Sequence, residues 1–146
     1  MPKRFTLAEA QRLLPEIETL IREAVSLKSQ YEEAEQELQS FVQRVAMQGG
    51  MTIDRDAVLQ QRAARDRHGA RLKAAVEQVH EYGCVIKDLD IGLVDFPTLF
   101  RGKEVYLCWK MGEAGIAHWH GVDEGFAGRK PIDPDFLENH SGDLAH

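Results

Sequence analysis

The feature that most constrains the fold is a long apolar series with helical spacing in the first third of the chain. Between Leu14 and Val45 its members are separated by alternating gaps of three and four residues, and only Lys28 and Glu35 carry a charge. This is the heptad pattern of a long helix that packs along another helix. The series consists of Leu14, Ile17, Ile21, Ala24, Lys28, Tyr31, Glu35, Leu38, Val42 and Val45.

The start of this helical region carries two further signals. Thr6 and Glu9 can form a capping box, in which each side chain accepts a hydrogen bond from the backbone amide of the other residue. Pro15 has no amide hydrogen and its ring clashes with the preceding turn, so we expect the helix to break there. The pattern predicts a short helix from Thr6 to Leu14 that lies across the sheet formed by the later part of the chain, and a long helix that begins at Pro15.

A return helix is expected after Gly49–Gly50, because paired glycines end a helix and turn the chain. It is predicted over Asp54–Tyr82, with Gly83 as the left-handed residue that ends it. At about 1.5 Å per residue the long helix and the return helix span roughly 50 Å and 43 Å, which matches an antiparallel hairpin. This pairing places Glu35 near Arg65, as a candidate ion pair between the helices.

Apolar residues near the tip of this hairpin would remain uncovered in a single chain. Because exposed apolar patches mark association surfaces, we expect a homodimer in which two hairpins complete a four-helix bundle. The residues concerned are Phe41, Val42, Val45, Met47, Met51, Ile53 and Val58.

After Gly83 the apolar spacing changes from the helical period to the period of strands. Short segments rich in β-branched and aromatic residues alternate with turn residues, which is typical of an antiparallel sheet. We expect three or four strands, mostly antiparallel. The segments that predict them are 84–88, 93–96, 104–110 and 116–120.

A chain of 146 residues is long enough for a single domain with its own apolar core. We expect an α+β fold in which a long antiparallel helical hairpin precedes a small sheet. Its parts are a helical part over 5–82 with a break at Pro15, a sheet with its following loop over 83–130, and a tail over 131–146. The tail is predicted to be a loop that frays into disorder.

Several motifs of the chain together resemble a known family. They are Phe5-Thr-Leu, Leu13-Leu-Pro, Val85-Ile-Lys-Asp-Leu-Asp, Gly92-Leu-Val-Asp-Phe-Pro, Cys108-Trp and Trp119-His-Gly-Val-Asp-Glu-Gly-Phe-Ala-Gly-Arg. In them the chain is similar to a small, uncharacterised prokaryotic family called domain of unknown function 2203. The similarity extends over nearly the whole chain. It implies a single-domain bacterial protein and brings no activity, substrate or site with it.

Composition restricts the partners and the compartment. The net charge of -6 argues against nucleic acid and anionic membranes as partners, since both require concentrated lysine and arginine. No apolar run approaches the roughly 20 residues of a membrane helix. The two cysteines form no Cys-x-x-Cys pair and no signal peptide precedes them, so we expect a reduced, cytoplasmic chain.

The segment 118–129 combines histidines, carboxylates and glycines, and it is the strongest candidate for a site. Alternation along a strand puts His118 and His120 on one face and Trp119 on the other. A His-x-His pair can offer two nitrogen ligands to a divalent transition metal such as zinc, and Glu124 or Asp123 could add an oxygen. The alternative is that both histidines are ordinary strand residues bonded to nearby carboxylates.

Three further residues are candidates for ligand binding. Asp88 and Asp95 could supply another metal ligand or orient an imidazole, although Asp residues are also common in turns. Arg129 follows a glycine-containing loop and could close over an anion, or it could pair with Asp95 or Glu124. Both Cys84 and Cys108 are expected to be small buried residues.

These observations lead to three hypotheses about function. The first is a cytoplasmic homodimeric interaction or scaffold protein that uses its helical hairpin. The second is a metal-binding protein or metalloenzyme with a His-x-His and carboxylate site. The third is a sensor of a small anionic ligand.

Overall fold

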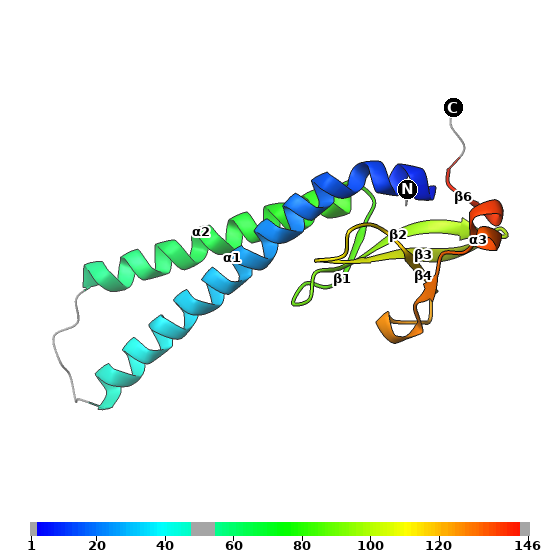
Figure 1. The fold of residues 1–146 in the computed structure, drawn as a ribbon. Helices are drawn as coiled ribbons and strands as arrows, with labels where there is room; N and C mark the ends of the chain where they lie inside the picture. The colour runs from blue at the N-terminus through cyan, green and yellow to red at the C-terminus, as the bar shows by residue number, and fades with distance from the viewer. Residues whose placement is uncertain (1–2, 48–54, 144–146) are drawn as a thin grey trace.

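The fold is known from a computed structural model, which describes residues 3–47 and 55–143. A helical hairpin extends from one end of a small twisted sheet, and the first part of the hairpin lies over that sheet (Figure 1). The predicted α+β arrangement of a helical hairpin followed by a mostly antiparallel sheet is therefore confirmed. The predicted turn at Gly49–Gly50 and the predicted cap at Asp54 lie outside the described residues.

The hairpin consists of α1 (Leu7–Met47) and α2 (Arg55–Glu81). The capping box forms as predicted: Thr6 donates its amide to Glu9 Oε1 at 3.0 Å, and Glu9 donates its amide to Thr6 Oγ1 at 3.1 Å. Gly83 follows α2 with a φ of 97°, which is the left-handed conformation expected of a residue that ends a helix. No helix in the described ranges combines the length and the apolar character needed to cross a membrane.

The predicted break at Pro15 is wrong, because α1 continues through this residue. A proline inside a helix removes one hydrogen bond and costs about 3 kcal/mol. Leu14, Ile17 and Ile21 are all buried around it, and each such side chain contributes roughly 1.5–3 kcal/mol on burial. Packing thus offsets the cost of the proline, and α1 bends near its N-terminal end without separating into two helices (Figure 1).

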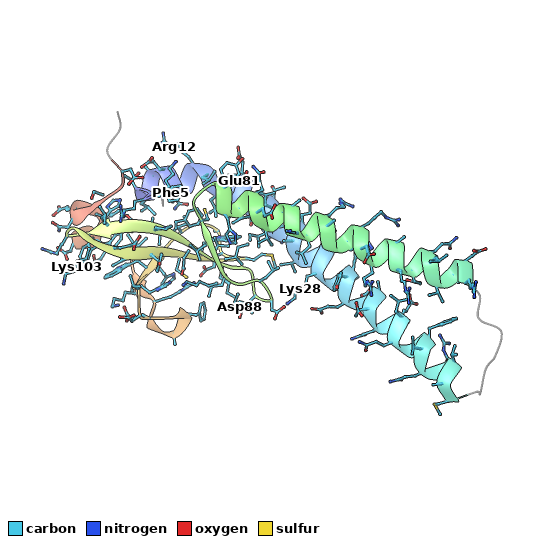
Figure 2. All side chains as sticks on the ribbon, turned by 180° about the vertical axis from the view of Figure 1, so that it is seen from behind. Phe5, Arg12, Lys28, Glu81, Asp88 and Lys103 are labelled. Carbon is cyan, nitrogen blue, oxygen red and sulfur yellow. The ribbon has the colours of Figure 1, made fainter. Side chains whose placement is uncertain are left out.

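The buried stripe of α1 also departs from the predicted heptad series. Leu27 and Ala34 are only 3% and 7% exposed, and they occupy the interior in place of the neighbouring Lys28 and Glu35. The stripe thus uses the residue one position earlier at each of these two levels, which buries an apolar side chain and avoids the cost of burying a charge. Lys28 points instead to the turn after β1, where it pairs with Asp90 (Figure 2).

Contacts between α1 and α2 set the spacing of the hairpin. The predicted pair forms, with Arg65 Nη1 3.4 Å from Glu35 Oε2. One turn before Glu35, the ring of Tyr31 lies against Gly69, where an added Cβ would approach the ring to 3.2 Å. Gly69 therefore lets the two helices approach closely at this level.

The sheet is antiparallel throughout, in the order β1-β2-β3-β4-β5, and β6 pairs with β2. A two-residue turn joins β2 to β3, and both Arg101 and Gly102 have positive φ angles of 52° and 80°, as in a type I′ hairpin. The four longer strands overlap the predicted segments, but β2 continues past its predicted end at Phe96, through Pro97 to Phe100. The strands are β1 (Val85–Asp88), β2 (Leu93–Phe100), β3 (Lys103–Lys110), β4 (His118–Gly121), β5 (Lys130–Pro131) and β6 (His140–Ser141).

The main core lies between α1 and one face of the sheet. Strand alternation directs every second residue of β2 and β3 to this face, and the register pairs Val94 with Trp109 and Phe96 with Leu107. All four side chains are fully buried. They pack with Phe5, Ala10, Leu14, Ile17, Ile21 and Val79 in one apolar cluster.

The prediction of a fraying tail from Pro131 onward is wrong for residues 131–143. This segment forms α3 (Pro134–Asn139), which Asp133 caps, and the short strand β6. Phe136 on α3 is fully buried, with its ring stacked on Phe100 and Trp119. A single aromatic residue in a polar segment carries no periodic signal, so only its docking into the core reveals that the segment is structured.

Phe136→Ala should lower the free energy of unfolding by about 3–5 kcal/mol, because it empties a fully enclosed aromatic site. The neighbouring Leu137 is 47% exposed, so Leu137→Ala is the matched control and should cost less than about 1 kcal/mol. Urea denaturation followed by circular dichroism measures both values. Equal effects of the two substitutions would show that α3 does not dock as described.

Candidate functional site

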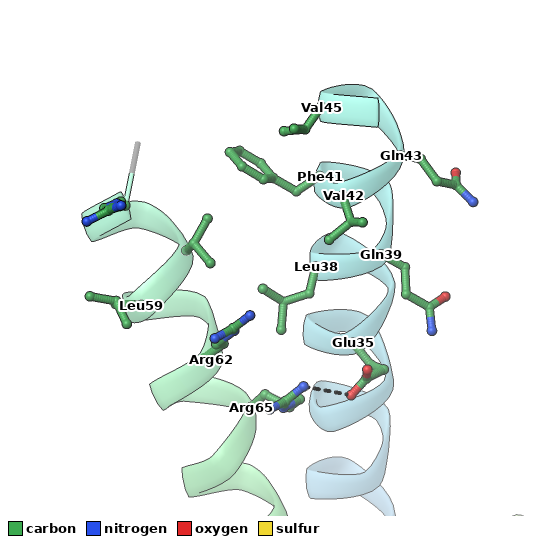
Figure 3. A pocket seen from close by; sticks show the side chains of 12 residues that line it. Glu35, Leu38, Gln39, Phe41, Val42, Gln43, Val45, Leu59, Arg62 and Arg65 are labelled. Carbon is green, nitrogen blue, oxygen red and sulfur yellow. Dashed lines mark hydrogen bonds and ion pairs between the residues drawn. The ribbon is translucent and has the colours of Figure 1, made fainter. Parts of the chain in front are cut away.

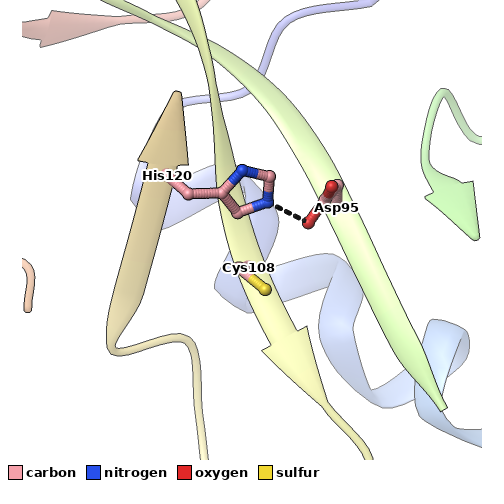
Figure 4. A group of neighbouring side chains, drawn as sticks. All are labelled: Asp95, Cys108 and His120. Atoms are coloured by element: carbon pink, nitrogen blue, oxygen red, sulfur yellow. Dashed lines mark hydrogen bonds and ion pairs between the residues drawn. The ribbon is translucent and has the colours of Figure 1, made fainter. Parts of the chain in front are cut away.

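A polar cluster is buried on the face of the sheet opposite the main core. It consists of Asp95 on β2, Cys108 on β3 and His120 on β4, which come from three neighbouring strands (Figure 4). Asp95 and Cys108 are directly paired, and His120 pairs with Tyr106, so its ring lies diagonal to Cys108. The same alternation puts His118 on this face and Trp119 on the other.

The three side chains are 0%, 0% and 2% exposed for Asp95, Cys108 and His120. One nitrogen, one oxygen and one sulfur atom from them lie within 4.8 Å of one another, as in a metal-ligand group. Within this group His120 Nε2 is 2.9 Å from Asp95 Oδ1. Buried polar groups of this kind need partners, since an unpaired buried carboxylate is costly.

The hydrogen bonds of His120 define where its protons are. Its Nδ1 is 2.8 Å from the carbonyl oxygen of Gly121, and a carbonyl can only accept, so Nδ1 carries a proton. The short contact between Nε2 and Asp95 Oδ1 then requires a second proton, held either by the imidazolium or by the carboxylic acid. The other oxygen, Asp95 Oδ2, is buried and has no hydrogen-bond partner.

Burial also determines the charge of the remaining groups. It raises the pKa of Asp95, while the hydrogen bond and charge of His120 act in the opposite direction. Burial, together with the negative charge of Asp95, raises the pKa of Cys108 to about 12. The Cys108 thiol is therefore neutral at pH 7 and a poor nucleophile, because the thiolate is the reactive form.

A second cluster lies at the edge of the same face, around Arg129. Its guanidinium binds Glu113 with two hydrogen bonds, of 3.0 and 2.7 Å, and donates to His118 Nδ1 at 2.9 Å. The guanidinium also lies 4.6 Å from the ring centre of Phe126. Arg129 thus pairs with Glu113 rather than with Asp95 or Glu124, and its two outer nitrogens are engaged within the protein.

The remaining predicted site residues lie apart from His120 and Asp95. Glu124 accepts hydrogen bonds from the Gly121 amide at 2.8 Å and from Lys130 Nζ at 2.5 Å. Asp123 is exposed in the same loop. Asp88 is at the exposed end of β1, where it accepts from the amide of Asp90. Within the described ranges, the ligand-type group around His120 includes none of these three carboxylates.

A different kind of surface is found at the far end of the hairpin. Here an apolar groove of about 890 Å³ lies between α1 and α2 (Figure 3). We call it the distal groove. It is lined by Glu35, Leu38, Gln39, Phe41, Val42, Gln43, Val45, Arg55, Val58, Leu59, Arg62 and Arg65.

Comparison with known proteins identifies the family. The model of a family described as "Uncharacterized conserved protein (DUF2203)" matches residues 3–132. The chain belongs to the DUF2203 family. Comparisons with curated proteins and with solved structures find no match. The expected family is thereby confirmed. Its description names no activity or site, so the geometry of this DUF2203 chain is the basis for assigning a site.

The sequence of this DUF2203 chain did not predict the contacts that two residues make in these clusters. Cys108 is buried, as predicted, but the sequence did not indicate that it shares a face with Asp95 and His120. The contact between Glu113 and Arg129 was not predicted. The alternation within each strand could have indicated which residues share a face, but only the register between strands tells which of them meet.

Glu113→Gln should destabilise the protein by about 1 kcal/mol at neutral pH, because it removes the charge from the two hydrogen bonds to Arg129. Partial burial raises the pKa of Glu113, but Arg129 and the Lys110 amide outweigh this and hold it below its ordinary value near 4.5. The stabilisation is therefore complete above the unfolded-state pKa and is lost as the pH falls through the folded-state pKa. Urea denaturation of both proteins between neutral and acidic pH measures this difference.

The matched control is Glu124→Gln, whose carboxylate bonds Lys130 in an exposed loop. It should have a smaller effect than Glu113→Gln, because exposed ion pairs are screened by solvent. A difference between wild type and Glu113→Gln that stays constant over the whole pH range would contradict the assigned pairing.

Proposed function

We propose that this DUF2203 chain is an interaction protein that forms a homodimer through its helical hairpin, with two hairpins packed as a four-helix bundle. The observation that carries the proposal is the distal groove, an apolar surface that the described residues of one chain leave open to solvent. Val42 and Leu59, on opposite sides of the groove, are 65% and 60% exposed. Large contiguous apolar surfaces on soluble proteins usually mark association sites.

The side chains along α1 support a helical occupant. Leu38, Phe41 and Val45 point toward α2, whereas Gln39 and Gln43 point away from it (Figure 3). The apolar residues follow helical spacing, so they present a stripe that another helix can match. Filling the groove with a helix from a second copy would bury this stripe without any further component.

Charge favours a second copy of the same chain as the occupant. In the distal half of the hairpin, α1 is acidic through Glu32, Glu33, Glu35 and Glu37, opposed by Arg44 alone. The matching half of α2 is basic, with the four arginines Arg55, Arg62, Arg65 and Arg67 against Asp56 and Asp66. When two hairpins pack with α1 of one chain against α2 of its partner, these opposite charges face each other, which favours that orientation.

The resulting function is that of a scaffold. Because the groove occupies the distal ends, the two sheets would lie at the outer ends of the dimer and remain open to other partners. We place this dimer in the cytoplasm, since both Cys84 and Cys108 are unpaired and free thiols are typical of reducing compartments.

Sedimentation velocity and light scattering at micromolar concentration should give the mass of two chains for the wild type. Leu59→Glu puts a charge into the distal groove and should weaken the dimer about tenfold or more. Leu137→Glu is the matched control, since Leu137 is similarly exposed but lies on α3, outside the hairpin. It should leave the mass of the particle unchanged.

A monomeric wild type at these concentrations would refute the proposed dimer. Equal weakening by Leu59→Glu and Leu137→Glu would also refute it, because the interface would then not be the distal groove. Far-ultraviolet circular dichroism of each variant shows whether the hairpin is still helical, so that a folding defect is not mistaken for dissociation.

A further inference from the structure

We propose that Asp95, Cys108 and His120 bind a divalent transition metal ion of the zinc class, through a carboxylate oxygen, the sulfur and Nε2. This site differs from the His-x-His and loop carboxylate set predicted from the sequence, of which it retains only His120. It is also independent of the proposed dimer, because the three ligands lie on the sheet and not on the hairpin.

The distances between the ligand atoms suit such an ion. With metal–ligand bonds of about 2.0–2.3 Å, the nitrogen and oxygen ligands of a tetrahedral zinc ion lie about 3.3 Å apart. His120 Nε2 and Asp95 Oδ1 are 2.9 Å apart, and the sulfur of Cys108 lies within 4.8 Å of both ligand atoms. The nitrogen and oxygen therefore have to move apart by about 0.4 Å, and the sulfur, which would lie about 3.6 Å from each of them around the ion, has to approach by at most about 1.2 Å.

The surroundings of His120 and Asp95 provide independent support. The Gly121 carbonyl holds the proton on Nδ1, so Nε2 directs its lone pair at the cluster once the proton it shares with Asp95 is displaced. Metal-binding histidines are commonly oriented by a backbone carbonyl in this way. In addition, Asp95 Oδ2 is buried without a hydrogen-bond partner, and a metal ion would satisfy this carboxylate.

The charges around the cluster are compatible with a divalent ion. A carboxylate and a thiolate would together neutralise its charge of two. Two basic groups act on the cluster: the Arg129 guanidinium beside Cys108 and the more distant Lys87. Arg129 is already paired with Glu113, and the Lys87 ammonium lies over the ring of Tyr106 at 5.1 Å.

Ion binding displaces protons, and this determines how the affinity for the ion depends on pH. The three ligand atoms determine the class of metal. The ion displaces the proton shared by His120 Nε2 and Asp95 Oδ1, and it also displaces the thiol proton of Cys108. Affinity should therefore rise with pH. A ligand set of nitrogen, sulfur and oxygen suits zinc, cobalt(II) or iron(II), whereas magnesium and calcium prefer oxygen alone.

The test is a titration of the full chain, purified without a histidine tag, with cobalt(II) under reducing conditions. We expect one ion per chain, a thiolate-to-cobalt charge-transfer band in the near ultraviolet, and loss of that band when zinc is added. Magnesium should leave the spectrum unchanged. The band reports the sulfur of Cys108 directly, because the other cysteine, Cys84, lies outside the cluster.

Cys108→Ser should abolish the charge-transfer band, and His120→Ala should weaken cobalt binding about tenfold or more. His118→Ala is the matched control, since His118 is two residues away on the same strand but bonds Arg129. It should keep both the band and the affinity.

Absence of the charge-transfer band in the wild type at stoichiometric cobalt would overturn the proposal, without depending on the folding of any variant. So would a loss of binding in His118→Ala as large as that in His120→Ala, because the half-buried imidazole of His118 would then be a ligand. Neither outcome bears on the dimer, whose test is the particle mass.

Discussion

The structure depends on the burial of one apolar stripe of α1 against two different partners. Near its N-terminus the stripe covers the sheet, where Ile17 and Ile21 meet the large side chains of β2 and β3. Further along, the same stripe packs on α2 through residues such as Leu27 and Ala34. Because both interfaces use one helix, α1 must be continuous. The helix therefore tolerates Pro15 in its interior, with a bend in place of a break.

The opposite face of the sheet follows from the same geometry. Alternation in β2, β3 and β4 sends apolar residues toward α1, so the intervening residues form a second surface. On that surface Asp95, Cys108 and His120 are buried together, although burial disfavours their charged forms. A shared proton, or the divalent ion proposed above, lowers the cost of keeping the carboxylate and the imidazole there. The neighbouring Arg129–Glu113 pair closes the edge of this surface.

The hairpin divides into a packed half and an open half. Close to the sheet, apolar side chains of α1 such as Leu14, Ile17 and Ile21 are buried in the core cluster. At the far end, residues such as Val42 and Leu59 face solvent beside the distal groove. The acidic side of α1 and the basic side of α2 also lie at this end. Apolar area and charge thus coincide at the part of the hairpin that the described residues leave uncovered, and this coincidence is the basis of the proposed dimer.

The sequence by itself determined the features that depend on local chemistry. The Thr6–Glu9 capping box, the stop at Gly83 and the alternation of the strands follow from backbone hydrogen bonding and from the helix and strand periods. Only the tertiary structure decided which distant residues meet. The register between strands brought Cys108 to Asp95 and His120, and docking into the core ordered the segment around Phe136. These contacts depend on how whole helices and strands pack against one another, and the local sequence does not specify that packing.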